Sequence, residues 1–413
     1  MPRYPAGMAA LNLTQFLGAM NDNILKLLII FFLIQLQGSQ RAGIITATAG
    51  AAFVLPFLLF SAPAGCLADR YGKARVSQLV KGAEVLITAL AVGAFALRME
   101  SGLYLLLFLM AGHSAFFAPA KYGIIPELAP RDELSRANGL IESFTFLAII
   151  LGTTLASLLT QATAGRFWLA ACCCLAISVA GLAASLRLPD LPPAAPHRRV
   201  QFLPTEIIRT LRHAAGDRWL LFSLIALAWF WLVGAFAQLN LIGYGIQHLG
   251  LDEARSGYLF LASSLGIGGG ALLAARLSGH EVELGIVTPG ALGLVIAPVL
   301  LHLVPPSLTA VLAVILLFGV SAGLYSLPLQ TFIQFRAEPA LRGEVLAASS
   351  FINWIGILIA SALTYLFSGP FKLSAAQGFS LLGLLTLLAM VVTWFWLPDV
   401  LRRFMTWCGG NRT

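Results

Sequence analysis

The sequence contains twelve runs of mostly apolar residues, each about as long as a helix that crosses a lipid bilayer. A transmembrane helix needs roughly 20 such residues to span the hydrocarbon core. No water is available there to pair with backbone N–H and C=O groups, so these runs must satisfy them internally as helices. We therefore predict an all-α membrane protein with twelve transmembrane helices. The predicted spans are residues 10–36, 44–66, 78–97, 102–124, 137–160, 166–187, 219–247, 254–277, 284–303, 306–331, 345–368 and 375–398.

The composition indicates a chain that lies mostly in the membrane. Hydrophobic residues make up 59% of the 413 residues and charged residues only 11%, against roughly 25% charged residues in an ordinary soluble domain. A soluble fold would leave much of this apolar surface in water, which excludes a soluble, a disordered or a nucleic-acid-binding protein. The sequence also lacks a catalytic triad pattern, a phosphate loop and a disulfide or zinc spacing of its five Cys. We expect no enzyme activity and no cofactor or metal.

The distribution of Lys and Arg predicts the orientation in the membrane. If the N-terminus is cytoplasmic, twenty of the 26 basic residues fall in cytoplasmic segments and five on the opposite side, with Lys26 inside the first span. Cytoplasmic loops carry such an excess of basic residues, so we expect both termini in the cytoplasm. The net charge of +8 then reflects topology and requires no polyanionic partner. Because polar residues interrupt the first run, we expect a span there rather than a cleavable signal.

Residues 188–218 divide the twelve runs into two sets of six. The segment contains five Pro and a basic stretch in which Ile207, Ile208 and Leu211 fall on one helical face. This pattern is typical of a short helix that lies at a membrane surface. We predict a cytoplasmic linker with an interfacial helix at 188–218, between an N-terminal six-helix bundle and a C-terminal one. The two bundles are residues 1–187 and 219–413.

The two sets of runs contain similar short sequences. Gly112-His113-Ser114-Ala115 lies in the fourth run, and Gly319-Val320-Ser321-Ala322 lies at the equivalent place in the tenth. Two six-helix repeats are a recurrent layout of secondary transporters, in which the substrate binds near the midplane between the halves. The repeat therefore favours a transporter. His113 itself is interpreted as a hydrogen-bonded packing residue.

The loop between the second and third runs reads Gly65-Cys66-Leu67-Ala68-Asp69-Arg70-Tyr71-Gly72-Lys73-Ala74-Arg75. The first Gly permits close helix approach, Asp69 can cap a helix end or pair with a neighbouring Arg, and Gly72 suits a tight turn. The pattern resembles the signature of the major facilitator superfamily, except that Ala74 takes the second basic position. The resemblance implies a loop that latches the two halves in the outward-open state; the alternative is an ordinary basic loop. The residues assigned to gating are Gly65, Asp69, Arg70, Gly72, Lys73 and Arg75.

The first run contains the polar residues Asn21, Asp22, Asn23 and Lys26. Ionisable residues inside a membrane are costly and by default indicate a functional site. Asp22 and Lys26 are four residues apart on one helical face and could neutralise one another. Three consecutive polar residues exceed what one ion pair needs, so we predict that this stretch contacts a ligand.

Further charged residues lie in or beside the third, fourth and fifth runs. Lys81 and Glu84 are three residues apart and can pair, for structural or for functional reasons. Glu142, four residues after Asn138, could pair with Lys121 across the helices. We predict that Lys121 and Glu142 form a charge relay that reports substrate occupancy.

Three motifs in the N-terminal half carry a closer resemblance. They are Asn21-Asp22-Asn23, Pro119-Ala120-Lys121-Tyr122-Gly123-Ile124 and Asn138-Gly139-Leu140-Ile141-Glu142. Over residues 10–160 the chain resembles the bacterial lysophospholipid transporter family, and likewise the transporter domain of acyl-ACP synthetase/acyltransferase fusions. The resemblance implies transport of lysophosphatidylethanolamine and lysophosphatidylglycerol from the outer to the inner leaflet of the bacterial cytoplasmic membrane. A cytoplasmic acyltransferase, a functional partner, then re-acylates the lipid.

The C-terminal half departs from this family at the seventh run. A basic residue is expected there, but the stretch Gly234-Ala235-Phe236-Ala237-Gln238-Leu239-Asn240 is uncharged. Gln238 and Asn240 could hydrogen-bond a headgroup but could not neutralise its phosphate. We hypothesise a cavity that is polar on one side and apolar on the other, as suits a one-tailed amphiphile.

The predicted function is inward flipping of lysophospholipids by alternating access, in a monomer that has no ATP site. Two alternatives remain. One is a proton-coupled exporter of amphiphilic compounds or drugs, with Asp22 or Glu142 as the proton carrier. The other is a non-transporting scaffold for an acyltransferase. The predicted substrate-binding residues are Asn21, Asp22, Asn23, Lys26, Lys121, Tyr122, Glu142, Gln238 and Asn240, and the predicted charge-pair residues are Lys81, Glu84 and Asn138.

Overall fold

The computed structural model describes residues 6–38, 42–197, 204–251, 253–278 and 282–408. Within these ranges the regular structure is helical and contains no strand. Twelve of the described helices are long and apolar enough to cross a membrane. Each of the twelve predicted spans overlaps one of them, so the predicted fold class is confirmed.

The long helices extend past most of the predicted ends, because an apolar run marks only the hydrocarbon core and helical hydrogen bonding continues into polar flanks. α2, for example, continues through Asp69 and Arg70. The membrane-length helices are α1 (Ala6–Gln37), α2 (Ala42–Tyr71), α3 (Lys73–Ala96), α4 (Glu100–Leu128), α5 (Leu134–Ala162), α6 (Phe167–Ser185), α8 (Arg218–Leu249), α9 (Glu253–Ser278), α10 (Val287–Leu303), α11 (Leu308–Arg336), α12 (Arg342–Ser368) and α13 (Ala375–Trp396). The shorter elements are α7 (Pro204–Ala214), α14 (Asp399–Cys408), η2 (Arg131–Glu133), η3 (Leu284–Ile286) and η4 (Pro339–Leu341).

The chain divides into two compact units. Relative to the predicted bundles, residues 130–146 belong to the second unit and residues 337–351 to the first. α5 and α12 therefore each contribute to both units. The six-plus-six division of the sequence stays a prediction. Unit 1 comprises residues 1–129, 147–213 and 337–351, and unit 2 comprises residues 130–146, 214–336 and 352–413.

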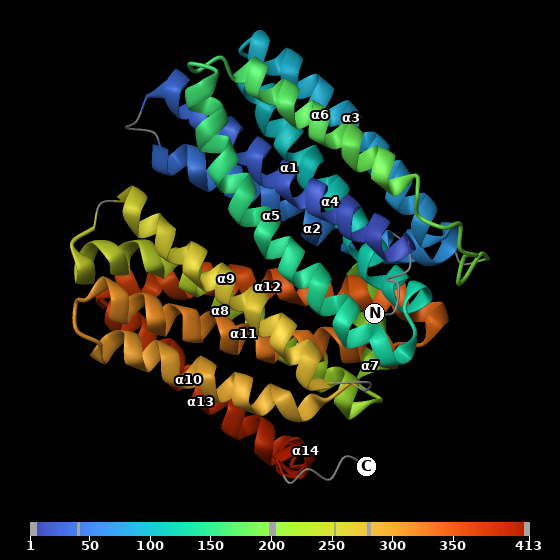
Figure 1. The fold of residues 1–413 in the computed structure, drawn as a ribbon, viewed down its shortest axis with the longest axis vertical. Coiled ribbons are helices and arrows are strands. Elements are labelled where there is room, and N and C mark those ends of the chain that lie inside the picture. The colour runs from blue at the N-terminus through green and yellow to red at the C-terminus, as the bar shows by residue number, and fades with distance from the viewer. Residues whose placement is uncertain (1–5, 39–41, 198–203, 252, 279–281, 409–413) are drawn as a thin grey trace. The chain divides into compact units, whose positions relative to one another are not determined.

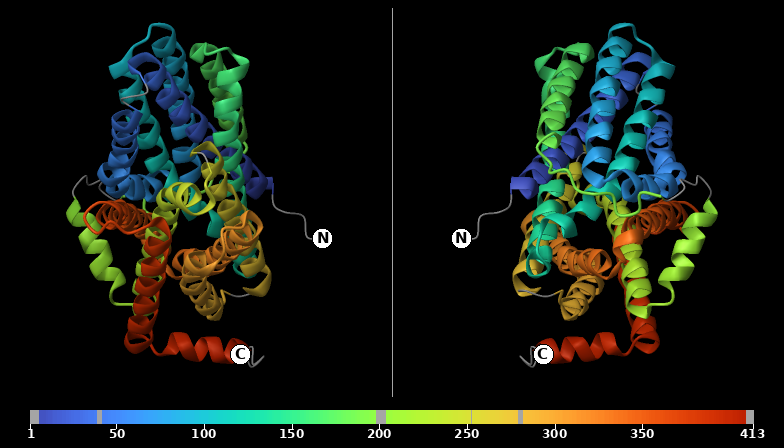
Figure 2. Two further views of the ribbon diagram at one scale, coloured as in Figure 1. Left: turned by 90° about the vertical axis from the view of Figure 1, so that its left-hand side faces the viewer. Right: turned by 90° about the vertical axis from the view of Figure 1, so that its right-hand side faces the viewer.

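In unit 1, α1 packs against α4 and α6, and α3 packs against the same two helices. Figure 1 shows these four helices side by side, and the two views of Figure 2 agree. The rings of Phe32, Phe95 and Phe167 join α1, α3 and α6, with centroids 5.3 to 6.0 Å apart. This apolar core fixes the helices that carry the polar residues of the first and third spans.

In unit 2, α9 and α11 approach so closely that glycine is needed at the contact. A Cβ at Gly266 would lie 2.7 Å from the Leu316 carbonyl oxygen, and one at Gly270 would overlap the backbone of Val320. Gly266 and Gly270 are four residues apart, the spacing of close helix packing in membranes. α10 packs against α11 and α13, and α14 turns across the end of α13 in Figure 2.

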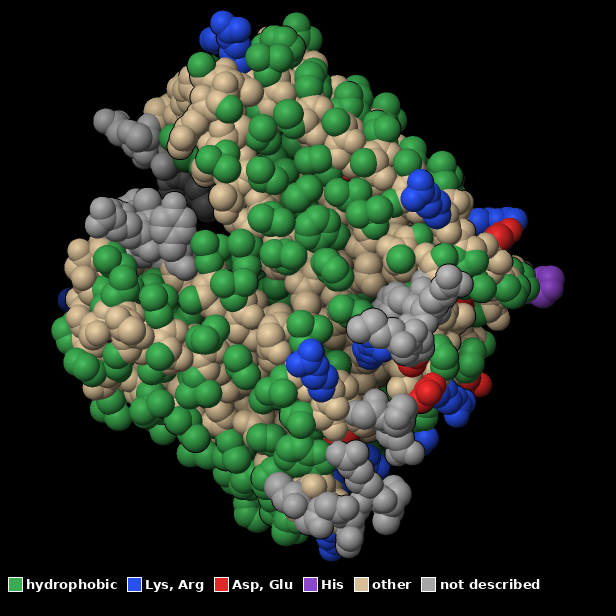
Figure 3. All heavy atoms as spheres, in the orientation of Figure 1, with side chains coloured by type: hydrophobic (Ala, Val, Ile, Leu, Met, Phe, Trp, Pro, Cys, Tyr) green, Lys and Arg blue, Asp and Glu red, His purple; other side chains and the backbone are tan. Residues whose placement is uncertain are grey.

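The surface is also that of a membrane protein. Hydrophobic side chains are spread across the face drawn in Figure 3, with few charged ones among them. Leu79, Leu86 and Leu90 of α3 are each more than half exposed. Large exposed apolar side chains of this kind are stable where lipid surrounds the helix.

A helix, α7, lies at the predicted place and is amphipathic, but only part of its predicted apolar face is buried. Its location at the membrane surface stays a prediction. Ile207 is buried, whereas Ile208 is about half exposed. Packing within unit 1 selects one of the two adjacent Ile residues, because neighbours in a helix point about 100° apart. The proline-rich part of the linker lies partly outside the described residues, at 198–203.

Candidate functional site

Unit 1 contains a buried cluster of polar side chains from α1, α3 and α4. Lys81 Nζ lies 2.6 Å from Glu84 Oε2, so their i,i+3 spacing does produce an ion pair. Asn21 Nδ2 donates to Glu84 Oε1 at 2.8 Å. All three side chains are almost completely buried. A charge in such surroundings is stable only when it is paired and hydrogen-bonded, as Glu84 is here.

Gly18 gives this cluster its space on α1. A Cβ at Gly18 would overlap Lys81 Nζ, so a larger residue would displace the ammonium group from the helix surface. Gly18 lies one turn before Asp22 in an apolar stretch, and its role could not be inferred from the sequence without knowing which face meets α3.

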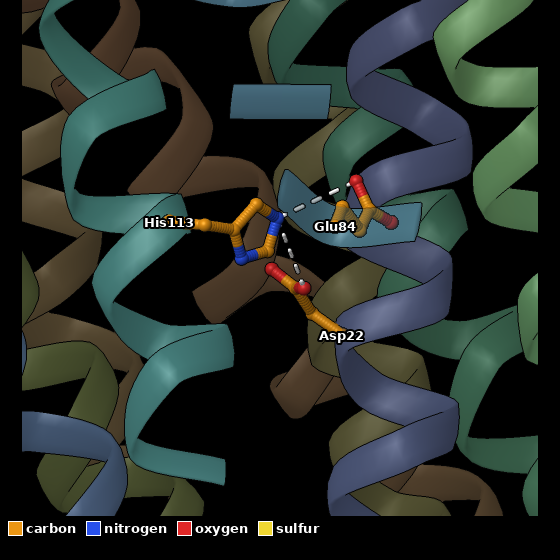
Figure 4. A group of neighbouring side chains, drawn as sticks. All are labelled: Asp22, Glu84 and His113. Atoms are coloured by element: carbon orange, nitrogen blue, oxygen red, sulfur yellow. Dashed lines mark ion pairs between the residues drawn. The ribbon is translucent and has the colours of Figure 1, made fainter. Parts of the chain in front are cut away.

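His113 of α4 joins the cluster, although the sequence favoured a packing role for it. Its Nε2 lies 3.4 Å from Glu84 Oε2 and 3.9 Å from Asp22 Oδ1 (Figure 4). Its Nδ1 hydrogen-bonds the carbonyl oxygen of Met110, one turn earlier in α4. The imidazole thus bridges carboxylates of two other helices. The sequence feature that could have indicated this role is the presence of an ionisable residue within an apolar span.

Asp22 completes the cluster from α1. Its Oδ2 accepts a hydrogen bond from Ser114 at 2.5 Å. Oδ1 of Asp22 and Oδ1 of Asn21 are buried without a hydrogen-bond partner among the described residues. Buried acceptors of this kind usually mark a ligand, a water or a functional site. The two oxygen atoms can therefore accept one or more further hydrogen bonds beside His113.

Asp22, Glu84 and His113 bring ligand atoms within 4.8 Å of one another, close enough for a metal ion. The Lys81 ammonium group, however, lies 2.6 Å from the Glu84 oxygen on the same side. A fixed positive charge at that position opposes a second cation at the site. We therefore interpret the group as an ion-paired, hydrogen-bonding cluster rather than a metal centre.

The other predicted residues of α1 have separate surroundings. Lys26 Nζ lies over the ring of Phe53, 4.9 Å from its centroid, in a cation–π contact. Asn23 Nδ2 donates to the carbonyl oxygen of Ala19 in the same helix. Asp22 contacts Ser114 and His113 of α4, which packs against α1, and it also interacts electrostatically with Lys26. A direct ion pair of Asp22 with Lys26 stays a prediction.

Lys121 and Glu142 belong to different compact units, so their predicted pairing stays a prediction. Lys121 Nζ lies 4.4 Å from the ring centroid of Tyr122 in unit 1. In unit 2, Glu142 accepts a hydrogen bond from Ser326 at 2.6 Å. Asn138 and Gln334 exchange two amide hydrogen bonds, each 2.8 Å long.

The polar residues of α8 are arranged differently from one another. Asn240 Nδ2 donates to the carbonyl oxygen of Ala375 at 2.7 Å, at the start of α13. Gln238 is exposed. Asn240 thus has a structural contact that the sequence did not indicate, and its carbonyl oxygen keeps the capacity to accept hydrogens.

The predicted gating loop forms a second buried charge cluster in unit 1. Asp69 Oδ1 accepts the backbone N–H of Gly343 at 3.1 Å and lies 3.8 Å from Lys73. Lys73 Nζ also contacts Glu127 at 2.5 Å. Gly343 lies in the first turn of α12, whose N–H groups have no partners within the helix and attract a carboxylate. Asp69 therefore caps a helix from the other half of the sequence, whereas Arg70 lies over the ring of Tyr71.

The two glycines of this loop have the predicted structural roles. A Cβ at Gly65 would lie 2.5 Å from the carbonyl oxygen of Gly343, so glycine permits the approach of α2 to α12. Gly72 has a φ of +81°, in the region that favours glycine, and connects α2 to α3. Arg75 pairs with Asp190 on the surface, at 3.3 Å.

The sequence model of the Major Facilitator Superfamily matches residues 11–361, most of the chain. The chain belongs to the Major Facilitator Superfamily. Two solved structures of superfamily-type transporters share the fold. The human organic anion transporter MFSD10 (TETRAN) has a TM-score of 0.77 at 19% identity, over 94% of this chain and 99% of its own. The Escherichia coli fucose:proton symporter FucP has a TM-score of 0.73 at 15% identity, over 92% and 96%.

Relatives within the superfamily narrow the assignment. The lysophospholipid transporter LplT of Klebsiella pneumoniae subsp. pneumoniae is 29% identical over 400 residues, which are 95% of this chain and 96% of the relative. LplT of Cronobacter sakazakii is 30% identical over 342 residues, 81% and 82% of the two chains. The resemblance to the lysophospholipid transporter family is therefore confirmed, and it extends well beyond residues 10–160.

Proposed function

We propose that this superfamily member moves lysophospholipids, such as lysophosphatidylethanolamine and lysophosphatidylglycerol, from the outer to the inner leaflet of a bacterial inner membrane. Its similarity to relatives named as lysophospholipid transporters supports the substrate class. The excess of basic residues in the predicted cytoplasmic segments supports a cytoplasmic location of both termini.

The proposal rests mainly on the surroundings of the Asp22 carboxylate. Its Oδ1 has no hydrogen-bond partner among the described residues, inside a cluster that already holds charges of both signs. The Asp22 carboxylate would accept hydrogen bonds from the ammonium or hydroxyl groups of the headgroup. Asn21 and Asn23 would add hydrogen bonds, and Lys26 would attract the phosphate. A headgroup that leaves water needs such compensation, because uncompensated burial of charge is strongly unfavourable.

Alternating access would be a rocking of the two predicted bundles, 1–187 and 219–398, around this site. Lys121, Tyr122 and Glu142 would report occupancy, and Gln238 and Asn240 would hydrogen-bond the headgroup from the C-terminal half. The contact of Asp69 with Gly343 supports the proposal that the loop of Gly65 to Arg75 closes one side. Transport would be driven by the lipid gradient, an ion gradient or re-acylation by a cytoplasmic acyltransferase.

The test is uptake of labelled lysophosphatidylethanolamine into spheroplasts that produce wild type or Asp22→Asn at equal levels. We expect at least a tenfold lower initial rate in Asp22→Asn. Glu338→Gln, which changes an exposed carboxylate to an amide, is the matched control and should retain the wild-type rate. Unchanged uptake in Asp22→Asn would contradict the assignment of Asp22 to the substrate site. Absence of uptake with wild type would contradict the transport function. The alternative of a non-transporting scaffold for an acyltransferase would then be the better explanation.

One observation favours a second candidate, a proton-coupled exporter of amphiphilic compounds. The Nδ1 of His113 must donate, because its partner is a carbonyl oxygen. Its Nε2 faces oxygens of Glu84 and Asp22, which accept but do not donate when ionised. Either Nε2 or one of the two carboxyl groups therefore carries a proton. The cluster would hold a transportable proton beside the proposed ligand contact.

Proteoliposomes with an imposed pH gradient separate the two candidates. A proton-coupled exporter would move its substrate against a gradient, and His113→Gln would abolish that coupling while binding persists. His302→Gln, an exposed histidine, is the control. If the pH gradient changes neither the rate nor the end point of lysophospholipid uptake, proton coupling is excluded and the lipid proposal is unaffected.

A further inference from the structure

Unit 2 contains two neighbouring cavities that the proposed transport site does not use. The first, of about 280 Å³, is mostly apolar and lies among α8, α10, α11, α13 and α14. Phe222, Trp229, Thr288, Tyr325, Met390 and Val400 are among its lining residues. The second, of about 610 Å³, is lined by the basic residues Arg131, Arg336 and Arg403 and by aromatic rings.

The two cavities follow one another along the same helix faces. On α8, Trp219 lines the basic cavity and Phe222 the apolar one, and their ring centroids are 6.2 Å apart. On α14, Arg403 lines the basic cavity and Val400 the apolar one. Each pair is three residues apart, so its two side chains lie on one face of the helix, one turn from each other. A molecule with a polar end and an apolar chain fits this order.

The length of the apolar face suits one leaflet of a bilayer. Thr386 and Trp396 are ten residues apart on α13 and mark the two ends of the cavity lining on that helix. At 1.5 Å per residue this is about 15 Å, which is half of the roughly 30 Å hydrocarbon thickness. An acyl chain that enters at the basic cavity would therefore end near the middle of the membrane.

The basic cavity can bind a phosphate. Cζ of Arg403 lies 4.5 Å from the ring centroid of Trp219, and Cζ of Arg131 lies 5.2 Å from that of Phe335. A guanidinium in a cation–π contact keeps N–H groups in the fork geometry that matches phosphate oxygens. Arg336 is bound to Asp217, and Asp132 also lines the cavity. Arg131 and Arg403 are therefore the residues that would contact the anion.

Thr288 supplies a second, independent feature. It is 3% exposed, lines the apolar cavity, and its hydroxyl has no hydrogen-bond partner among the described residues. It lies in the first turn of α10, directly after η3. The hydroxyl is thus available to an ester oxygen that follows a headgroup, where a purely apolar occupant would leave it unpaired.

We propose that unit 2 binds one anionic phospholipid of the surrounding bilayer, such as phosphatidylglycerol. Arg131 and Arg403 bind the phosphate, Thr288 hydrogen-bonds an ester, and one acyl chain fills the apolar cavity. Basic pockets between transmembrane helices are suited to anionic lipid headgroups. α14 lies over the boundary between the two cavities, so the bound lipid holds this helix at the membrane surface. By the predicted topology, this is the cytoplasmic leaflet.

Native mass spectrometry of the purified full-length protein tests the site. Phosphatidylglycerol, phosphatidylethanolamine or inorganic phosphate is added in equal steps to wild type, Arg403→Gln and Arg402→Gln. Arg402 is the matched control, because it is the neighbouring residue, is three-quarters exposed and pairs with Asp399. We expect one tightly bound phosphatidylglycerol, weaker binding of phosphatidylethanolamine, and a roughly fivefold loss of affinity in Arg403→Gln only.

A second variant tests the acyl-chain cavity. Ala291→Trp places a bulky ring in the apolar cavity, and Val392→Trp places one at a more exposed lining position in case the first variant misfolds. Both should lower phosphatidylglycerol binding and leave binding of inorganic phosphate unchanged. Equal losses in Arg402→Gln and Arg403→Gln, equal binding of the two phospholipids, or full displacement of the lipid by phosphate would each overturn the proposal.

Discussion

The interiors of the two compact units are stabilised in different ways. Among the described residues, every Asp, Glu, Lys and Arg that is at least nine-tenths buried belongs to unit 1. The interior of unit 2 instead holds amides, hydroxyl groups and closely packed glycines, such as the Asn138–Gln334 pair and the contact of α9 with α11. The buried charges of unit 1 are Asp69, Lys73, Lys81, Glu84, Arg342 and Glu344.

This difference indicates which unit retains residues for function at the expense of folding stability. A buried ion pair is rarely the most stable choice for a core, since apolar residues of similar size are often as good or better. Unit 1 keeps two such clusters, one around Glu84 and one around Asp69. The interior of unit 2 is stabilised by close packing, which avoids the desolvation of charged groups. We infer that the buried charges of unit 1 are retained for binding and gating, whereas the interior of unit 2 is stabilised mainly by close packing.

The largest expected effect is on the Glu84 cluster of unit 1. Lys81→Met leaves the Glu84 carboxylate buried without its ion-pair partner and should cost about 3–5 kcal/mol of unfolding free energy. The double variant Lys81→Met/Glu84→Gln removes both charges and should recover most of that loss. Thermal unfolding of the purified protein in detergent measures both. Equal losses in the single and the double variant would contradict the distinction between the two units.

Glycine packing in unit 2 should give the next largest effect. In Gly270→Ala the new Cβ meets the backbone of Val320, which cannot move aside easily, so we expect a loss of about 3 kcal/mol. Gly269→Ala is the matched control, because nothing lies within 4 Å of its Cβ position. Alanine is the better helix former, so this control should gain up to about 1 kcal/mol. The same unfolding measurement applies, and a loss in both variants would refute a specific contact of α9 with α11.

The amide pair of unit 2 should matter less than the ion pair of unit 1. Asn138→Leu leaves the buried Gln334 side chain without the partner of two hydrogen bonds, at a cost of about 1–2 kcal/mol. Asn138→Leu/Gln334→Leu should restore part of the stability. A double-mutant cycle gives the coupling energy. A coupling as large as that of Lys81 and Glu84 would remove the contrast between charged and uncharged interiors.

The smallest effect concerns a charge of unit 2 that lies outside the spans. Desolvation tends to raise the pKa of Asp217, but the hydrogen bonds from Arg336 and from the N–H groups at the start of α8 outweigh it and hold the pKa below its usual value. The associated stability is present above the pKa of the unfolded state, near 3.9. It is lost as the pH falls through the lower pKa of the folded state.

Asp217→Asn removes this titration while keeping a side chain that can cap α8. Its thermal stability should therefore depend less on pH between pH 5 and pH 3 than that of wild type. Because the pair with Arg336 is partly exposed, the difference should be below about 1 kcal/mol. Parallel pH profiles for the two proteins would show that Asp217 contributes no such stability.

Much of the fold was predictable from the sequence because a bilayer leaves few choices. Apolar runs of about 20 residues must be helices there, and all twelve predicted spans coincide with long helices. The roles of Gly65 and Gly72 were also predictable, since a tight turn and a close approach have a specific glycine signature. Helix ends were predicted less well, because α2 and α11 continue into charged residues.

The candidate site was only partly predictable. Lys81 and Glu84 could be paired from their spacing on one helix, because that contact is local. The positions of His113 beside Glu84 and of Ser114 beside Asp22 depend on how α4 rotates against α1 and α3. Nothing in the local sequence specifies that rotation. The same holds for Asp69, which caps α12 rather than pairing with Arg70 next to it.

The sequence by itself determined the membrane environment, the number of spans, the family and a short set of ionisable residues that had to be compensated. Each of these follows from composition, local spacing or similarity along the chain. Only the tertiary structure decided which residue compensates which charge, because contacts across helices depend on helix rotation and packing. Unit 1 meets that requirement with residues from three helices around His113, and unit 2 avoids it by burying no charge among its described residues.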